Sequence, residues 1–175
     1  MKHKLYFIAL LFINILTTSC SLDDIDYQND FEKSQNNWLD FKESSNDSYK
    51  YLVSGGSVFT DYGWETTITV SNGVIIERHF EYTGNTVNIP VDQLEWTENE
   101  NEINSTKYEY SLAATALTLD EIYLKAEQDW LIKRKNATSY FESENNGLIS
   151  TCGYVEKECM DDCFIGIIIE SIVNL

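Results

Sequence analysis

The densest group of reactive side chains lies in CGYVEKECMDDC, residues 152–163, which holds three cysteines and four acids within twelve residues. Thiolates bind zinc and carboxylates bind calcium, so a metal site is the most specific chemistry that this segment could support. The segment lacks the paired CxxC units and the histidine of common zinc sites. Its acids, Glu156, Glu158, Asp161 and Asp162, do not follow the twelve-residue calcium loop. We therefore expect no metal cofactor.

The same cysteines permit a disulfide. Cys152, Cys159 and Cys163 form an odd set, which in an oxidising compartment indicates one disulfide and one remaining thiol. If the last two strands form a hairpin with Cys152 opposite Cys163, then Ser150 faces Ile165 and the apolar residues share a face. We favour the pairing of Cys152 with Cys163, and Cys159 stays open as an alternative partner.

Catalytic groups are harder to assemble from this chain. His79 is the single histidine beyond the first nineteen residues, and the predicted register places it on a solvent-facing strand surface opposite Glu65. The chain has no GxSxG turn to supply a serine nucleophile for a triad. A pair of carboxylates spaced for glycoside cleavage stays open in a chain with 29 acids. We predict no catalytic residues and no cofactor.

The N-terminal residues predict export and lipidation. Lys2 and Lys4 precede the apolar run Leu5–Leu16, which is too short to span a membrane and suits the core of a signal peptide. The run ends in LTTSC, which resembles the bacterial lipobox although a threonine stands where a branched apolar residue is usual. We predict a lipoprotein signal peptide at residues 1–19, a lipidated Cys20 and an outer-membrane location on the periplasmic or cell-surface side. The alternative is an ordinary signal peptide that is cut nearby.

The residues after Cys20 and the overall charge are both acidic. Residues 20–30 contain four aspartates without an opposing base, so we predict an acidic tether that precedes a single domain at residues 31–175. The whole chain has 12 basic and 29 acidic residues and a net charge of −17. Removal of residues 1–19 takes away two lysines and no acids, which lowers this charge to −19. Such a surface repels phosphate backbones, so we expect no nucleic-acid partner.

Periodicity and turn signals predict an α+β fold. Asp30 can cap a helix that carries Phe31, Trp38, Leu39 and Phe41 and fades by Ser44. Thr118 and Glu121 match a capping box that begins a second helix near residues 119–134. Strand patterns occur at residues 49–53, 64–70, 74–82, 139–143, 148–155 and 163–173, and residues 83–107 are expected to form an exposed insertion. We predict an antiparallel sheet of about six strands with two helices packed on one face.

The hairpin around Asn72-Gly73 allows a register to be predicted. A three-residue loop, Ser71 to Gly73, would pair Val70 with Val74, Ile68 with Ile76 and Trp64 with Phe80, and all six would share one buried face. We therefore expect a bulged three-residue loop rather than a two-residue turn on Asn72-Gly73.

Several segments taken together resemble a bacterial lipoprotein family, of the type found in Bacteroidota, whose domain has no known function. They are Trp38, YKY from Tyr49, VSNGVI from Val70, LTLDEIYLKAEQDWL from Leu117, YFESENNGLISTCGY from Tyr140 and CMDDCFIGI from Cys159. The resemblance implies a small anchored domain and supplies no catalytic residues. We expect a lipid-anchored cell-envelope protein that acts as a non-catalytic binding or structural module, with an envelope-anchored hydrolase or metal-dependent binding protein as the alternative.

Overall fold

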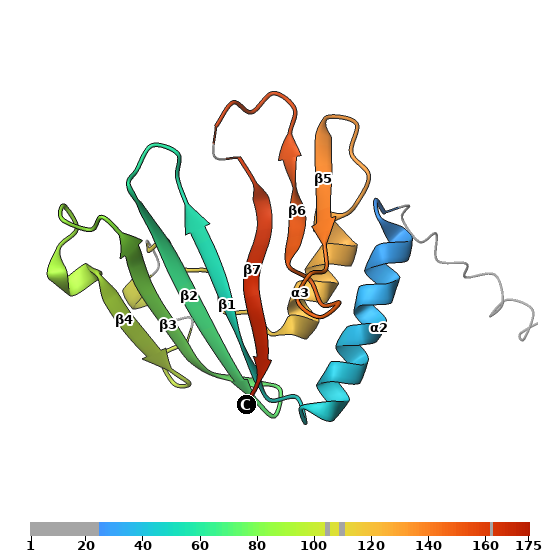
Figure 1. The fold of residues 1–175 in the computed structure, drawn as a ribbon, viewed down its shortest axis with the longest axis horizontal. Helices are drawn as coiled ribbons and strands as arrows, with labels where there is room; N and C mark the ends of the chain where they lie inside the picture. The colour runs from blue at the N-terminus through green and yellow to red at the C-terminus, as the bar shows by residue number, and fades with distance from the viewer. Residues whose placement is uncertain (1–24, 104–105, 109–110, 162) are drawn as a thin grey trace, which may run out of the picture.

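The computed structural model describes residues 25–103, 106–108, 111–161 and 163–175. Within them, one antiparallel sheet of seven strands has the order β4-β3-β2-β1-β7-β6-β5, and two helices accompany it (Figure 1). The strands are β1 (Tyr49–Gly56), β2 (Tyr62–Ser71), β3 (Val74–Gly84), β4 (Glu95–Asn99), β5 (Ala137–Glu142), β6 (Thr151–Glu156) and β7 (Ile165–Asn174). The helices are α2 (Gln28–Ser44) and α3 (Leu119–Lys125), which continues as a π-helical turn over Ala126–Trp130. The predicted α+β class with an antiparallel sheet is confirmed.

The seventh strand, β4, lies in the segment that was expected to be an exposed insertion. Its alternate residues Trp96 and Glu98 are buried, and it pairs with β3 from Glu77 to Glu81. The strand pattern of this segment is weak because Glu98 occupies an inward position that is normally apolar. The expectation of exposure holds for the preceding loop, where Val87 and Val91 are exposed.

The sheet consists of two antiparallel meanders that meet at its centre. One contains β1 to β4, the other contains β5 to β7, and β1 pairs with β7 from Tyr49↔Asn174 to Val53↔Ile169. The register shifts between Leu52 and Val53, so that Glu170 of β7 is an extra residue in a bulge. A bulge bends its strand, and beyond Ile169 the pairing with β1 stops. The two meanders therefore separate at one end of the sheet.

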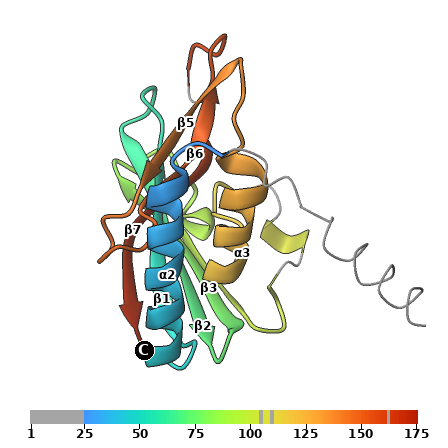
Figure 2. The same ribbon diagram turned by 90° about the vertical axis from the view of Figure 1, so that its right-hand side faces the viewer.

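Both helices pack on the sheet face that carries the tyrosines of β1 (Figure 2). The rings of Trp38 on α2 and Tyr49 are 5.3 Å apart and nearly perpendicular. The N–H of Leu119, at the start of α3, donates a hydrogen bond of 2.8 Å to the hydroxyl of Tyr49, and the hydroxyl of Tyr51 donates one to the carbonyl of Leu117. Burial raises the pKa of both tyrosine hydroxyls above their usual range. These phenols therefore stay protonated and hold α3 against the centre of the sheet.

The helix predictions are largely confirmed, with two differences. The capping box of Thr118 and Glu121 is present, but the α-helical part ends at Lys125 rather than near residue 134. Helix α2 begins earlier than expected, after Tyr27 in the left-handed conformation, so Asp30 lies in its first turn instead of capping it. Leu39, which was expected on the apolar side, is 55% exposed.

The folded domain also begins earlier than residue 31. Ile25 forms a β-bridge with Ile132, and the N–H of Asp26 donates a hydrogen bond of 2.7 Å to the carbonyl of Leu131. The Asp26 carboxylate accepts a hydrogen bond from the Ser139 hydroxyl. The predicted tether over residues 20–30 is therefore too long, because its second half belongs to the fold.

The register predicted for the β2–β3 hairpin is wrong. Ser71 pairs with Val74 across a two-residue turn in which both Asn72 and Gly73 have positive φ. A bulge at Ile76 follows, so Ile68 pairs with Arg78. Val74 is 50% exposed and Ile76 is 37% exposed. The sequence pattern did not reveal this bulge. It shifts β3 by one residue and so returns Phe80 to the buried face.

A buried ion pair joins the outer strands to the chain segment before α3. The guanidinium of Arg78 on β3 lies 2.6 Å from the carboxylate of Glu98 on β4, whose side chain is fully buried. Arg78 also donates a hydrogen bond of 3.2 Å to the carbonyl of Ala114 and lies over the ring of Trp96. A buried pair of this kind adds little net stability, but the loss of one partner is costly.

We predict that Arg78→Met lowers the free energy of unfolding by about 3–5 kcal/mol, because it removes the guanidinium that Glu98 faces in the interior. Urea denaturation of the protein measures this loss. The double variant Arg78→Met, Glu98→Leu is expected to lose less than the single variant, since no buried charge is then left behind. A double variant less stable than Arg78→Met would contradict this interpretation of the pair.

Candidate functional site

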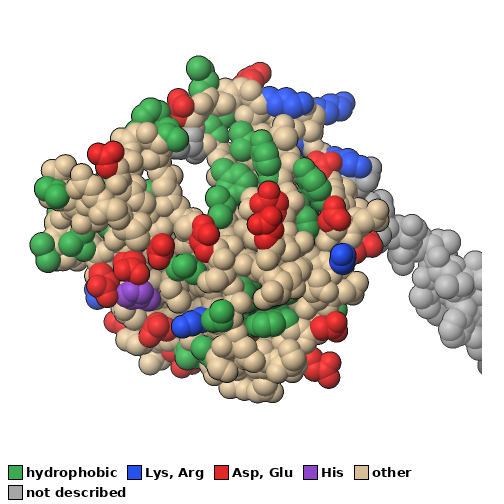
Figure 3. All heavy atoms as spheres, viewed as in Figure 1, with side chains coloured by type: hydrophobic (Ala, Val, Ile, Leu, Met, Phe, Trp, Pro, Cys, Tyr) green, Lys and Arg blue, Asp and Glu red, His purple; other side chains and the backbone are tan. Residues whose placement is uncertain are grey.

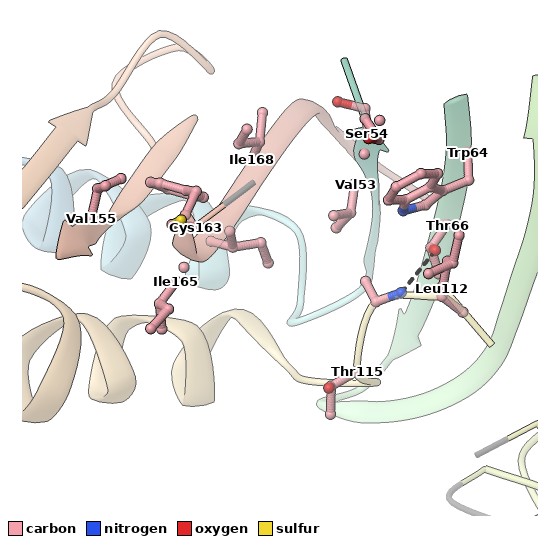
Figure 4. A pocket seen from close by; sticks show the side chains of 18 of the residues that line it. Val53, Ser54, Trp64, Thr66, Leu112, Thr115, Val155, Cys163, Ile165 and Ile168 are labelled. Atoms are coloured by element: carbon pink, nitrogen blue, oxygen red, sulfur yellow. Dashed lines mark hydrogen bonds between the residues drawn. The ribbon is translucent and has the colours of Figure 1, made fainter. Parts of the chain in front are cut away.

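A cleft opens where β1 and β7 separate. It has a volume of about 930 Å³ and lies between the end of β1 with the adjoining part of β2 on one side and the start of β7 with Val155 of β6 on the other (Figure 4). Residues 112–115, with Leu117, cross its inner side, and Lys125 and Trp130 border it from the α3 region. The first wall is formed by Val53, Ser54, Gly55, Gly56, Ser57, Trp64 and Thr66, and the second by Phe164, Ile165, Gly166, Ile167 and Ile168.

Trp64 lies directly against the backbone of β1. Gly55 is its cross-strand partner, and a Cβ atom built on Gly55 would lie 2.2 Å from the indole nitrogen of Trp64. Gly55 thus has no side chain because the indole occupies that space. At the neighbouring Gly56, by contrast, a Cβ atom would meet nothing within 4 Å. The position of this wall of the cleft depends on one glycine and not on the other.

The inner side of the cleft is fixed by contacts to its backbone. The N–H of Ala114 donates a hydrogen bond of 3.0 Å to the hydroxyl of Thr66, drawn as the dashed line in Figure 4. The carbonyl of Ala114 accepts from Arg78, and the carbonyl of Leu117 accepts from Tyr51. The buried ion pair and the central tyrosine therefore both position this segment.

The outer margin of the cleft carries the disulfide. Cys159 and Cys163 are joined, with Cα atoms 6.1 Å apart, and both line the cleft together with Met160 and Asp161. The favoured pairing of Cys152 with Cys163 is not the one that the structure contains, and the alternative partner Cys159 takes that place. The physical reason is the hairpin register, in which β7 begins at Ile165 and Cys152 lies opposite Ile167.

Cys152 is a free thiol in the core. Its side chain is fully buried, and burial raises the pKa of this thiol to about 12. Because the thiolate is the reactive form, Cys152 is poorly placed for nucleophilic or metal chemistry.

His79 lies away from the cleft, on the sheet face opposite to the helices. Its Nδ1 atom is 3.0 Å from the Thr97 hydroxyl, and its Nε2 atom is 3.8 Å from the Glu95 carboxylate. The histidine is opposite Thr67 on β2 rather than opposite Glu65, as the predicted register had it. Figure 3 shows acidic side chains spread over the face of the molecule that it views.

The described acids of the 156–162 segment are Glu156, Glu158 and Asp161. Within the described residues, no cluster of three or more histidine, cysteine, aspartate or glutamate side chains has suitable geometry. Asp162 lies outside the described residues, as do the predicted signal peptide at residues 1–19 and the predicted lipidation site Cys20. Neither helix of the described part is both long and apolar enough to cross a membrane.

The cleft was not foreseen from the sequence. Its walls come from strands whose apolar residues were interpreted as core, and the signal that could have located it is the Gly55-Gly56 pair beside the predicted strand end. No family model, curated protein or solved structure matches the chain. The resemblance to a lipoprotein family therefore stays a prediction.

The state of the cysteines can be tested by thiol labelling. At pH 8, an alkylating reagent is expected to leave Cys152 unmodified in the folded, non-reduced protein and to label it after denaturation in urea. The raised pKa implies that this thiol stabilises the fold fully below about pH 9 and that the stabilisation is lost as the pH rises toward 12, since only the unfolded chain releases the proton in that range.

Mass mapping is expected to find Cys159 linked to Cys163. A Cys152–Cys163 link would refute this assignment.

Proposed function

We propose that this chain is a lipid-anchored, non-catalytic binding protein of the bacterial outer membrane, and that the cleft between β1 and β7 is its binding site. The cleft is the observation that carries the proposal. Its volume of about 930 Å³ lies at the upper end of the range for ligand sites, and it is lined mainly by apolar and small residues.

The chemistry of the lining favours binding over catalysis. Its ionisable side chains among the described residues are Lys125 and Asp161, both exposed and on different margins of the cleft, while the two cysteines there are joined. A hydrolase needs a nucleophile, base or acid pair within hydrogen-bond reach of the substrate. Apolar walls with scattered hydroxyls instead suit recognition of an uncharged, partly apolar ligand.

The proposed anchor would keep the cleft near the membrane. Ile25, the first described residue, follows Cys20 by five positions, and five steps of a fully extended chain span at most about 18 Å. With lipid chains on Cys20, the domain would therefore work close to the bilayer rather than at the end of a long tether. Its acidic surface, with a charge of −19 after loss of residues 1–19, would disfavour close adhesion to anionic lipids.

Lipidation can be tested in bacterial cells that express the full chain. We expect labelled palmitate to enter the wild-type protein and the control variant Cys152→Ala, but not Cys20→Ala, because only Cys20 follows the signal sequence. The wild-type protein is expected in the outer-membrane fraction. Equal label in Cys20→Ala and wild type would rule out this anchor.

Binding in the cleft can be tested with a neutral alkyl diazirine that crosslinks on illumination, applied to membranes that contain the full protein. We expect crosslinks in the peptides of residues 53–66 and 163–168. Ile168→Glu should reduce this labelling about tenfold, since a charge in an apolar wall opposes the probe. Ile76→Glu is the matched control, because Ile76 on β3 is similarly exposed, 37% against 40%, but lies outside the cleft. Crosslinks outside the peptides that line the cleft, or an equal loss of crosslinking in both variants, would count against the site.

A further inference from the structure

The walls of the cleft include two strand edges that face one another. Ser54, Gly55 and Gly56 pair with β2 on one side, and residues 165–168 pair with β6 on one side. Pairing between β1 and β7 ends at Val53↔Ile169, so the other edges of these two segments border the cleft. In a β-strand, alternate residues direct their N–H and C=O groups to opposite neighbours. Each edge therefore presents backbone donors and acceptors to the space between.

We propose that the cleft accepts an extended peptide, which adds as an extra strand between β1 and β7. This inference rests on the proposed function, since it assumes that the cleft is a binding site and names the class of ligand. Because β1 and β7 run antiparallel, a strand inserted there would be antiparallel to one edge and parallel to the other. It would hydrogen-bond to both edges, where ordinary strand addition uses a single edge.

The edges have the length and composition that backbone contact requires. Residues 165–168 form an edge of about 13 Å, which matches four residues of an added strand. Gly56 has no side chain to obstruct the approach of another backbone, and the space where its Cβ atom would lie is empty to 4 Å. Trp64 and Val53 on one wall, and Ile165 and Ile168 on the other, supply apolar contacts for the side chains of the incoming strand.

Charge around the cleft specifies the kind of peptide. Glu65 lies opposite Ser54 in the sheet, and the carboxylate of Glu170 accepts a hydrogen bond from the Ser54 hydroxyl. Asp161 lines the opposite margin. These acids outnumber Lys125, the one basic side chain among the described lining residues, and the net charge is −17. Together they favour a segment whose apolar centre is flanked by lysine or arginine. The partner is therefore a basic-flanked, extended peptide.

The test uses a fluorescent heptapeptide of alternating valine and threonine with a lysine at each end, and the mature lipidated protein in lipid nanodiscs. Binding is measured by anisotropy, with empty nanodiscs as the background. The five interior amides of the peptide are N-methylated one at a time. Insertion between two edges predicts that methylation at four consecutive interior positions weakens binding by about three- to tenfold, since each of these amides bonds one edge or the other.

Each other outcome overturns the inference in a recognisable way. Weakening at alternate positions only would indicate a single edge, and no effect at any position would exclude strand addition. Equal binding of the same peptide with glutamate ends would contradict the charge argument. Crosslinking of the alkyl probe in the cleft without peptide binding would leave the proposed site in place but replace its ligand by an apolar small molecule. If sedimentation detects a dimer of the protein that the peptide dissociates, the occupant of the cleft is a second copy of the chain.

A pair of variants makes the test independent of the peptide design. Gly55→Ala places a methyl group where the Trp64 indole lies and is expected to weaken peptide binding at least tenfold. The control Ile76→Ala shortens an exposed side chain on β3 outside the cleft and should change binding less than twofold. Urea denaturation shows whether Gly55→Ala remains folded, and the methylation series on wild-type protein decides the question if it does not.

Discussion

The pairing of β1 with β7 holds the two meanders of the sheet together, and the rest of the structure depends on it. It occupies only Tyr49 to Val53 and Ile169 to Asn174, beneath the helices, where tyrosine rings and isoleucines are buried. Burial of such side chains favours pairing at that end by several kcal/mol. The bulge at Glu170 then turns β7 away. The same two strands therefore join the sheet at one end and open the cleft at the other.

The inner side of the cleft is linked to distant parts of the fold. Thr66, Arg78 and Tyr51 each bind the backbone of the segment before α3, and Arg78 is itself oriented by the buried carboxylate of Glu98. These polar groups are satisfied within the core, since the described residues contain no buried side-chain nitrogen or oxygen atom without a partner. A rigid inner side with glycine-rich edges suits recognition of a backbone, in which position matters more than side-chain chemistry.

The sequence was informative where local physics decides the structure. The capping box at Thr118 involves residues three apart, and the alternation from Tyr49 to Val53 needs only one buried face, so both could be predicted. The hairpin register and the disulfide could not, because each depends on a bulge or strand offset that costs little locally and is selected by packing elsewhere. Strand β4 was not predicted because Glu98 can be buried only through its pairing with Arg78, which lies twenty residues earlier in the chain. The cleft could not be predicted from the sequence either, because it forms where β1 and β7 stop pairing.

The attachment of the first described residues has a mechanical consequence. Ile25 and Asp26 are bonded to Ile132 and Leu131, immediately after Trp130, which borders the cleft. Tension applied through an N-terminal lipid would thus enter the domain at the end of the α3 region before it reaches α2. Force on the proposed anchor and the shape of the cleft would be coupled through a single turn of the chain.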